Sequence, residues 1–162
     1  MDSYLLLKMI HVLSSMVLVG TGAGIAFFML MASRSGNQQG VLVTTRIVVQ
    51  ADWLFTAPAV LIQFVSGLLL MQRLGYSYSS SWFITVMSLF VFIGLCWLPV
   101  VRIQYKLRHL AEQLVIQGDS RRPLLAAQFR SLMRLWLMLG VPAFGSIIVI
   151  IYLMIFKPIS II

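Results

Sequence analysis

Apolar residues dominate four long segments of the chain, at about residues 4–32, 53–72, 82–101 and 135–156. A run of roughly 18 or more residues with few charges indicates a transmembrane helix, and each segment meets this length. Polar and turn-forming residues separate the segments, for example at residues 33–40. The pattern therefore predicts an all-α integral membrane protein, a four-helix bundle that forms a single transmembrane domain over residues 1–162.

The composition indicates the same class of protein. Hydrophobic residues make up 60% of the chain and charged residues 10%, whereas a soluble domain carries about 25% charged residues. The apolar run at residues 4–32 is about twice as long as the core of a signal peptide, so we expect it to be retained as a helix. The four segments leave no room for a separate soluble domain.

Basic residues are unevenly distributed between the two sides of the expected bundle. Nine of the 12 lysines and arginines lie on the side of the first and third loops, and three lie on the other side. Because cytoplasmic loops are enriched in lysine and arginine, this count places both termini outside. The net charge of +8 then reflects topology and contact with anionic lipid headgroups, not binding of nucleic acid. Without a transit peptide, we expect a multi-pass protein of the cell inner membrane. The nine residues are Arg34, Arg46, Arg102, Lys106, Arg108, Arg121, Arg122, Arg130 and Arg134, and the other three are Lys8, Arg73 and Lys157.

The third and fourth helices are expected to extend into the cytoplasm. Apolar residues recur at helical spacing among charged ones over residues 103–114. Residues 41–50 mix apolar and polar side chains, and we interpret them as a lead-in to the second helix that lies near the membrane surface. On the opposite side, Tyr76, Tyr78 and Trp82 are typical of an interfacial aromatic belt.

The first helix carries two ionisable residues, Lys8 and His11, which are three positions apart and therefore share one face. An ionisable side chain inside a membrane span is unfavourable and marks a candidate functional site. His11 could bind a cofactor, or it could hydrogen-bond Ser15 or a serine or threonine of another helix. Further along, Gly20 and Gly24 have the small-xxx-small spacing that lets another helix approach closely.

The second helix has one polar line, with spacings of four, three, four and three residues, formed by Asp52, Thr56, Ala59, Gln63 and Ser66. Because this line would be unfavourable against lipid, we expect it to face the bundle interior. Asp52 also suits the positive end of a helix dipole, which is the structural alternative for this carboxylate. Pro58 is expected to kink the helix and to free a backbone carbonyl.

No motif of the common soluble enzymes is present in the sequence. It has no glycine-rich phosphate loop, no paired-cysteine metal site and no His-Glu-x-x-His motif. Of the four acidic residues only Asp52 lies near a span, so catalysis by two carboxylates is not expected. A histidine among four apolar helices remains, and helix bundles hold haem in this way.

Several motifs carry a resemblance to known families. They are Lys8-x-x-His11, Thr56-Ala57-Pro58, Ser66-Gly67-Leu68-Leu69-Leu70, Trp82 at the start of the third helix, and Lys157-Pro158. Together they resemble the HemJ type of protoporphyrinogen IX oxidase, with copper-resistance D-like membrane proteins as more distant relatives. The chain is most similar to an uncharacterised family of predicted integral membrane proteins with the same layout, over nearly its whole length. That similarity includes Ala51-Asp52-Trp53 and Gly140-Val141-Pro142-Ala143-Phe144.

This resemblance implies a haem b cofactor, with His11 as an axial ligand of the haem iron and Lys8 beside a propionate or a substrate carboxylate. It implies a redox protein that passes electrons from a porphyrinogen, or another lipid-accessible donor, to quinone. Related oxidases carry a functional lysine on the third helix, at the position where this chain has Val86. The iron would then be five-coordinate or bound by another group.

Two other functions are compatible with the residues. The chain could be a non-enzymatic accessory or assembly subunit, in which the glycine face of the first helix and the polar line of the second dock a partner membrane protein. It could also be a small transporter, with a path built between the two chains of a homo-oligomer.

Overall fold

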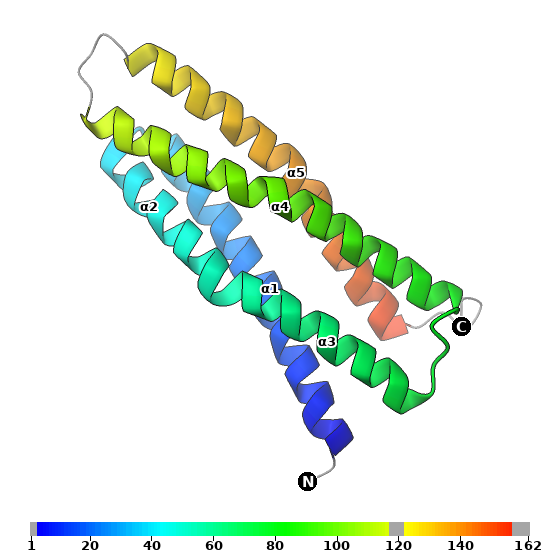
Figure 1. Cartoon of the computed structure of the whole chain (residues 1–162). Helices are drawn as coiled ribbons and strands as arrows, with labels where there is room; N and C mark the ends of the chain where they lie inside the picture. The colour runs from blue at the N-terminus through cyan, green and yellow to red at the C-terminus, as the bar shows by residue number, and fades with distance from the viewer. Residues whose placement is uncertain (1–2, 117–121, 157–162) are drawn as a thin grey trace.

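The computed structural model describes residues 3–116 and 122–156, and all regular structure in these ranges is helical. The elements are α1 (Ser3–Arg34), α2 (Gln38–Ala51), the π-helical turn η1 (Asp52–Thr56), α3 (Ala57–Leu74), α4 (Ser81–Ile116) and α5 (Arg122–Phe156). Because α2, η1 and α3 form one continuous rod, the described chain contains four helices long and apolar enough to cross a membrane. The predicted all-α membrane bundle is therefore confirmed (Figure 1). The Lys157-Pro158 motif lies outside the described residues.

The second rod begins earlier than the sequence pattern suggests. Asn37 caps its start, because the Asn37 Oδ1 atom accepts a hydrogen bond of 3.1 Å from the Gly40 N–H. Residues 41–50, the expected lead-in, are helical: they form most of α2, which continues through η1 into α3. The helix-dipole interpretation of Asp52 is wrong, because a complete 14-residue helix precedes this carboxylate.

The irregularity that Pro58 predicts is a π-helical turn immediately before it. The Ala57 N–H donates to the carbonyl oxygen of Asp52, five residues back. Proline has no N–H to continue the regular ladder, and a wider turn accommodates this loss. Single π turns of this kind frequently occur at functional sites, and this one contains two residues of the polar line, Asp52 and Thr56.

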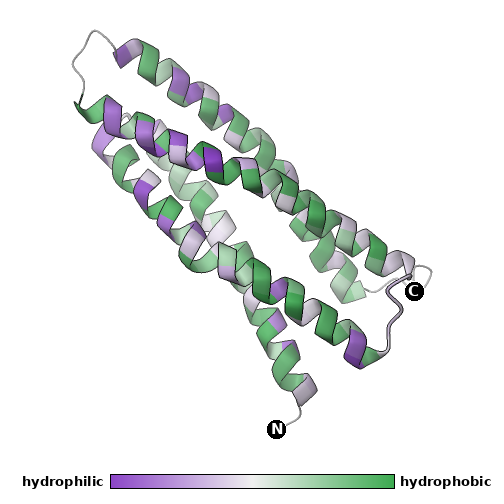
Figure 2. Ribbon diagram, in the orientation of Figure 1, coloured by the Kyte–Doolittle hydropathy of each residue, from purple (hydrophilic) through white to green (hydrophobic). Residues whose placement is uncertain are grey.

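One end of the bundle is tightly packed and polar outside. α4 and α5 have 36 and 35 residues. At a rise of about 1.5 Å per residue, each helix is much longer than the ~30 Å thickness of a bilayer core. Hydrophilic residues gather where α4 ends and α5 begins (Figure 2), so both helices extend past the membrane as expected. α2 lies alongside and extends with them. The core there consists of Ile25, Met29, Leu42, Val48, Val100, Ile103, Leu107, Ala111, Leu114, Leu125, Phe129, Met133 and Trp136.

A smaller cluster closes the opposite end, where Met71, Trp82, Val86 and Leu153 are buried together. The Trp82 Nε1–H donates to the carbonyl oxygen of Leu153 over 2.8 Å. The assignment of Trp82 to an interfacial belt is therefore wrong, because its indole joins α4 to α5 inside the protein. Between the two clusters most large apolar side chains are exposed, as expected for a surface that faces lipid.

Candidate functional site

His11 joins α1 to α3 through a continuous chain of hydrogen bonds. Its Nδ1 atom lies 2.8 Å from Oγ of Ser66, and its Nε2 atom lies 3.0 Å from Nε2 of Gln63. The Ser66 hydroxyl donates to the carbonyl oxygen of Ile62, and the Ser14 hydroxyl donates to Oε1 of Gln63. These side chains therefore connect two helices that are about fifty residues apart in sequence.

Both nitrogens of the imidazole have a hydrogen-bond partner on α3. The Ser66 hydroxyl and the Gln63 amide can each donate or accept, so these two side chains suit either neutral tautomer of the ring. Hydrogen bonding to a serine of another helix, one of the alternatives expected from sequence, accounts for its presence in the span.

This arrangement does not fit His11 as a haem ligand. Axial ligation needs a ring nitrogen with a free lone pair, and here Ser66 and Gln63 occupy both ring nitrogens. The imidazole also contacts Gly67, where an added Cβ atom would lie 3.2 Å from His11 Cε1.

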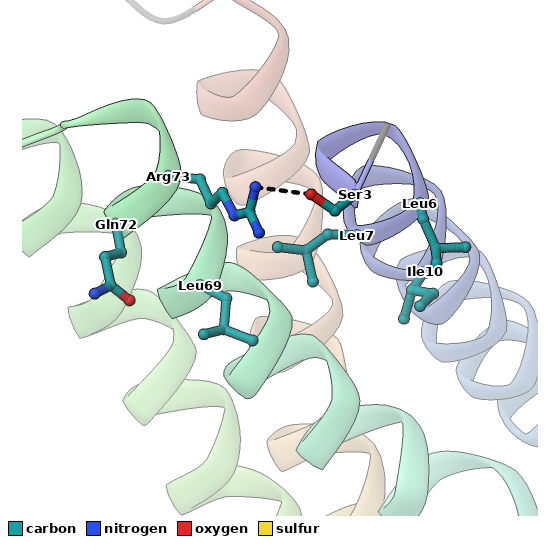
Figure 3. Close-up of a pocket in the computed structure, with 7 residues that line it drawn as sticks. All are labelled: Ser3, Leu6, Leu7, Ile10, Leu69, Gln72 and Arg73. Atoms are coloured by element: carbon teal, nitrogen blue, oxygen red, sulfur yellow. Dashed lines mark hydrogen bonds between the residues drawn. The ribbon is translucent and has the colours of Figure 1, made fainter. Parts of the chain in front are cut away.

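Lys8 does not share the environment of His11. Its side chain is exposed and makes no hydrogen bond or ion pair within residues 3–116 and 122–156. A groove nearby is lined by Ser3, Leu6, Leu7, Ile10, Leu69, Gln72 and Arg73. Its arginine already has a partner, because Arg73 Nη1 donates to Ser3 Oγ over 2.8 Å (Figure 3). The groove therefore has few polar groups available to bind a ligand.

The glycines of α1 do not mediate close packing within the chain. An added Cβ atom at Gly20 would meet no heavy atom within 4 Å, and one at Gly24 would meet only Phe28 of the same helix. The expected close approach of another helix at these positions is therefore wrong for this chain. Gly67 of α3 has that role, because it lies against the ring of His11.

A cavity of about 400 Å³ lies between the helices, and all four long helices contribute to its lining. This volume falls in the range of small-molecule sites, roughly 300–1,000 Å³. Three glycines from different helices, Gly22, Gly94 and Gly140, line it, and an added Cβ atom at each would enter open space. His11 does not line the cavity, whereas its partner Gln63 does. Most of the remaining lining consists of apolar side chains.

The polar end of this cavity contains an unusual concentration of unpartnered atoms. Five buried side-chain N or O atoms in the described residues lack a hydrogen-bond partner. All five belong to residues that line the cavity, and they are Asp52 Oδ2, Thr56 Oγ1, Trp97 Nε1, Gln104 Oε1 and Trp136 Nε1. Each such group costs about 1–3 kcal/mol when it is left without a partner. An occupant of the cavity would remove this penalty.

Asp52 is the charged member of this group. Its side chain is 5% exposed, and Thr56, Gln104 and Trp97 surround the carboxyl. None of these three contacts brings a partner to Oδ2 at hydrogen-bonding geometry. Within the described residues the ion pairs are those of Glu112 with Arg46 and Arg108, so no cation balances Asp52.

The structure divides the polar line of the second helix between two places. Asp52 and Thr56 line the cavity, Ser66 belongs to the hydrogen-bond chain of His11, and Gln63 contributes to both. Trp97, Gln104 and Trp136 are members of the cavity site that the sequence analysis missed. A polar glutamine within the apolar stripe at residues 103–114, together with tryptophans inside spans, was the available signal.

Comparison with known proteins gives the family but not an activity. The family described as "Predicted integral membrane protein (DUF2269)" matches residues 5–158. No curated protein and no solved structure matches the chain. Since the match covers almost the whole sequence, and the described residues form four helices long and apolar enough to cross a membrane, the chain belongs to the DUF2269 family of integral membrane proteins.

Proposed function

We propose that this protein binds a lipid-soluble amphipathic molecule in the cavity between its four helices. The observation that carries the proposal is that all five unpartnered buried side-chain N and O atoms of the described residues belong to residues that line one largely apolar cavity. A polar head at Asp52, Thr56, Gln104 and the two indoles would satisfy these atoms, and an apolar body would fill the remainder. Water could satisfy the polar end, but the apolar lining favours hydrocarbon over water.

The location of the site follows from the proposed topology. With nine basic residues on one side and three on the other, both termini lie outside and the packed end of α2, α4 and α5 lies in the cytoplasm. The polar end of the cavity includes Val100 and Trp136, which also belong to that packed core. The ligand head would therefore point toward the cytoplasmic side of the cell inner membrane.

Haem b, the electron transfer to quinone and the relationship to the HemJ and copper-resistance D-like proteins stay predictions of the resemblance. The hydrogen bonds of His11 do not support a ligand role for that imidazole. An accessory role stays a prediction too. The polar line expected to dock a partner faces α1 and the cavity of its own chain, with Asp52, Thr56 and Ser66 buried.

Native mass spectrometry with dodecanol as a neutral probe tests the proposed function. The purified protein is released from detergent at increasing dodecanol concentrations, and the bound molecules are counted. We expect saturation at one dodecanol for each chain. Gly140→Leu fills open space in the cavity and should abolish this binding, whereas the matched change Gly145→Leu also enters open space but lies outside the lining.

Equal dodecanol binding by Gly140→Leu and Gly145→Leu would refute the cavity as the site. No saturable binding of dodecanol, nor of the same 12-carbon chain with a charged head, would refute the proposed function itself.

A further inference from the structure

We infer that the head of the cavity ligand is a protonated amine, with Asp52 as its counter-ion. This inference rests on the proposed function and adds the chemical class of the ligand. It arises from the balance of charge and of hydrogen-bonding groups at the polar end of the cavity.

The charge balance calls for a cation. Asp52 lies in a π-helical turn inside a membrane-spanning rod and is 5% exposed. A carboxyl group in an apolar interior either takes up a proton or pairs with a cation. No arginine, lysine or histidine forms an ion pair with it within the described residues. A cationic head placed in the cavity would supply the missing charge.

The acceptors at this end match an ammonium group. Asp52 Oδ2 and Gln104 Oε1 both lack donors and come from different helices, η1 and α4. An ammonium group carries three N–H donors and can serve both oxygens at once. Bonds between charged partners are about twice as strong as neutral ones, so this pairing would contribute a large share of the affinity.

The indoles at the same end suit the remainder of such a head. Trp97 and Trp136 line the cavity from α4 and α5, and tryptophan is the aromatic side chain that attracts cations best. Their Nε1–H groups have no acceptor. An oxygen beside the amine, as in a long-chain amino alcohol, would accept from them. A simple alkylamine would meet the charge requirement and is therefore sufficient as a probe.

The apolar part of the ligand would be long and narrow. The open space over Gly22, Gly94 and Gly140 lies along three helices of the bundle. Beyond it the lining continues to Ile147, Ile150 and Ile151 on α5. An alkyl chain or a narrow ring system bonded to the amine would lie against these residues.

The test compares three probes with the same 12-carbon chain: dodecylamine, dodecanol and dodecanoic acid. Affinities are measured by native mass spectrometry for the unmodified protein, for Asp52→Asn and for Glu112→Gln. The two variants each remove one negative charge, but Glu112 lies outside the cavity in an ion pair with Arg46 and Arg108. Partition into the detergent is the same for all three proteins, so ratios between them report the site.

We expect the unmodified protein and Glu112→Gln to prefer dodecylamine over dodecanol by about tenfold or more. Asp52→Asn should lose this preference while still binding dodecanol, which also shows that the variant is folded. If Asp52→Asn cannot be purified, the probe preference of the unmodified protein decides alone. Equal affinity for dodecylamine and dodecanol, a preference for dodecanoic acid, or a preference that persists in Asp52→Asn would overturn the amine assignment. The proposed function fails differently, when none of the three probes binds.

Discussion

Gln63 binds His11 on one side and lines the cavity on the other: its Nε2 atom lies 3.0 Å from His11 Nε2, while its side chain forms part of the cavity wall. The histidine that stands out in the sequence is therefore adjacent to the site without being part of it. Its role is to hold α1 against α3, so that one side chain of α3 keeps its orientation beside the cavity.

This role predicts a loss of stability when the imidazole is removed. His11→Ala deletes two bonds between helices and leaves the Gln63 amide without this partner. Interhelical hydrogen bonds in membranes contribute roughly 0.6 kcal/mol on average, so we expect about 1–2 kcal/mol in total. Thermal unfolding in detergent measures the effect, with Lys8→Ala as the control because Lys8 is exposed and unpaired among the described residues. If the two variants unfolded at the same temperature, the result would argue against a role of His11 in holding α1 against α3.

Gly67 should tolerate a side chain only when His11 is absent. A Cβ atom there would lie 3.2 Å from His11 Cε1, so Gly67→Ala pushes the ring by a few tenths of an ångström and strains its hydrogen bond to Ser66. We expect Gly67→Ala to destabilise the protein by about 1 kcal/mol through the weakening of this bond. In the His11→Ala background it should stabilise by up to about 1 kcal/mol, because alanine is the better helix former. A double-mutant cycle measures the difference. Gly145→Ala, which enters open space, should stabilise both backgrounds, and additive effects of Gly67→Ala and His11→Ala would contradict the contact.

The hydrogen bonds of His11 also predict the optical spectrum. Haem added to the purified protein should give no Soret band that depends on His11, because Gln63 occupies Nε2. Reduced-minus-oxidised spectra of the unmodified protein and of His11→Ala should therefore be the same. A Soret band that disappears only in His11→Ala would restore the ligand role, and would require Gln63 to leave the imidazole.

The proposed topology can be measured with single cysteines. In a Cys96→Ala background, Ser35→Cys lies in the connection between α1 and α2, and Ser79→Cys lies in that between α3 and α4; both positions are exposed. We expect a membrane-impermeant thiol reagent to label Ser79→Cys in intact cells. Ser35→Cys should be labelled only after the membrane is opened. The reverse pattern would place both termini in the cytoplasm.

The fold was largely predictable because membrane-spanning helices follow from apolar length alone. The four segments at about 4–32, 53–72, 82–101 and 135–156 all lie inside helices of the structure. The start of the second rod was not predictable in this way. Residues 41–50 are too polar to resemble a span, and they are helical because α2 packs against α1 and α4.

The site was less accessible from the sequence. Periodicity groups Asp52, Thr56, Gln63 and Ser66 on one line. It cannot show that some of these residues line a cavity while others belong to the hydrogen-bond chain of His11. The other three residues of the polar end are Trp97, Gln104 and Trp136, which lie on α4 and α5 and meet η1 only in three dimensions. A lone histidine in a span attracts attention because of its chemistry, whereas a cavity is a property of packing that single-helix patterns do not contain.

The four tryptophans allow the most direct test of ligand binding in the cavity. Trp97 and Trp136 line it with unpartnered Nε1–H groups. The other two indoles have acceptors elsewhere: Trp82 donates to Leu153 and Trp53 donates to Tyr105. The four indole ¹⁵N–¹H resonances, assigned with tryptophan-to-phenylalanine variants, are followed during titration with dodecylamine. Saturable shifts of Trp97 and Trp136, with Trp53 and Trp82 unchanged, are the result that our account predicts. Shifts of equal size at all four indoles, or at Trp53 alone, would contradict it.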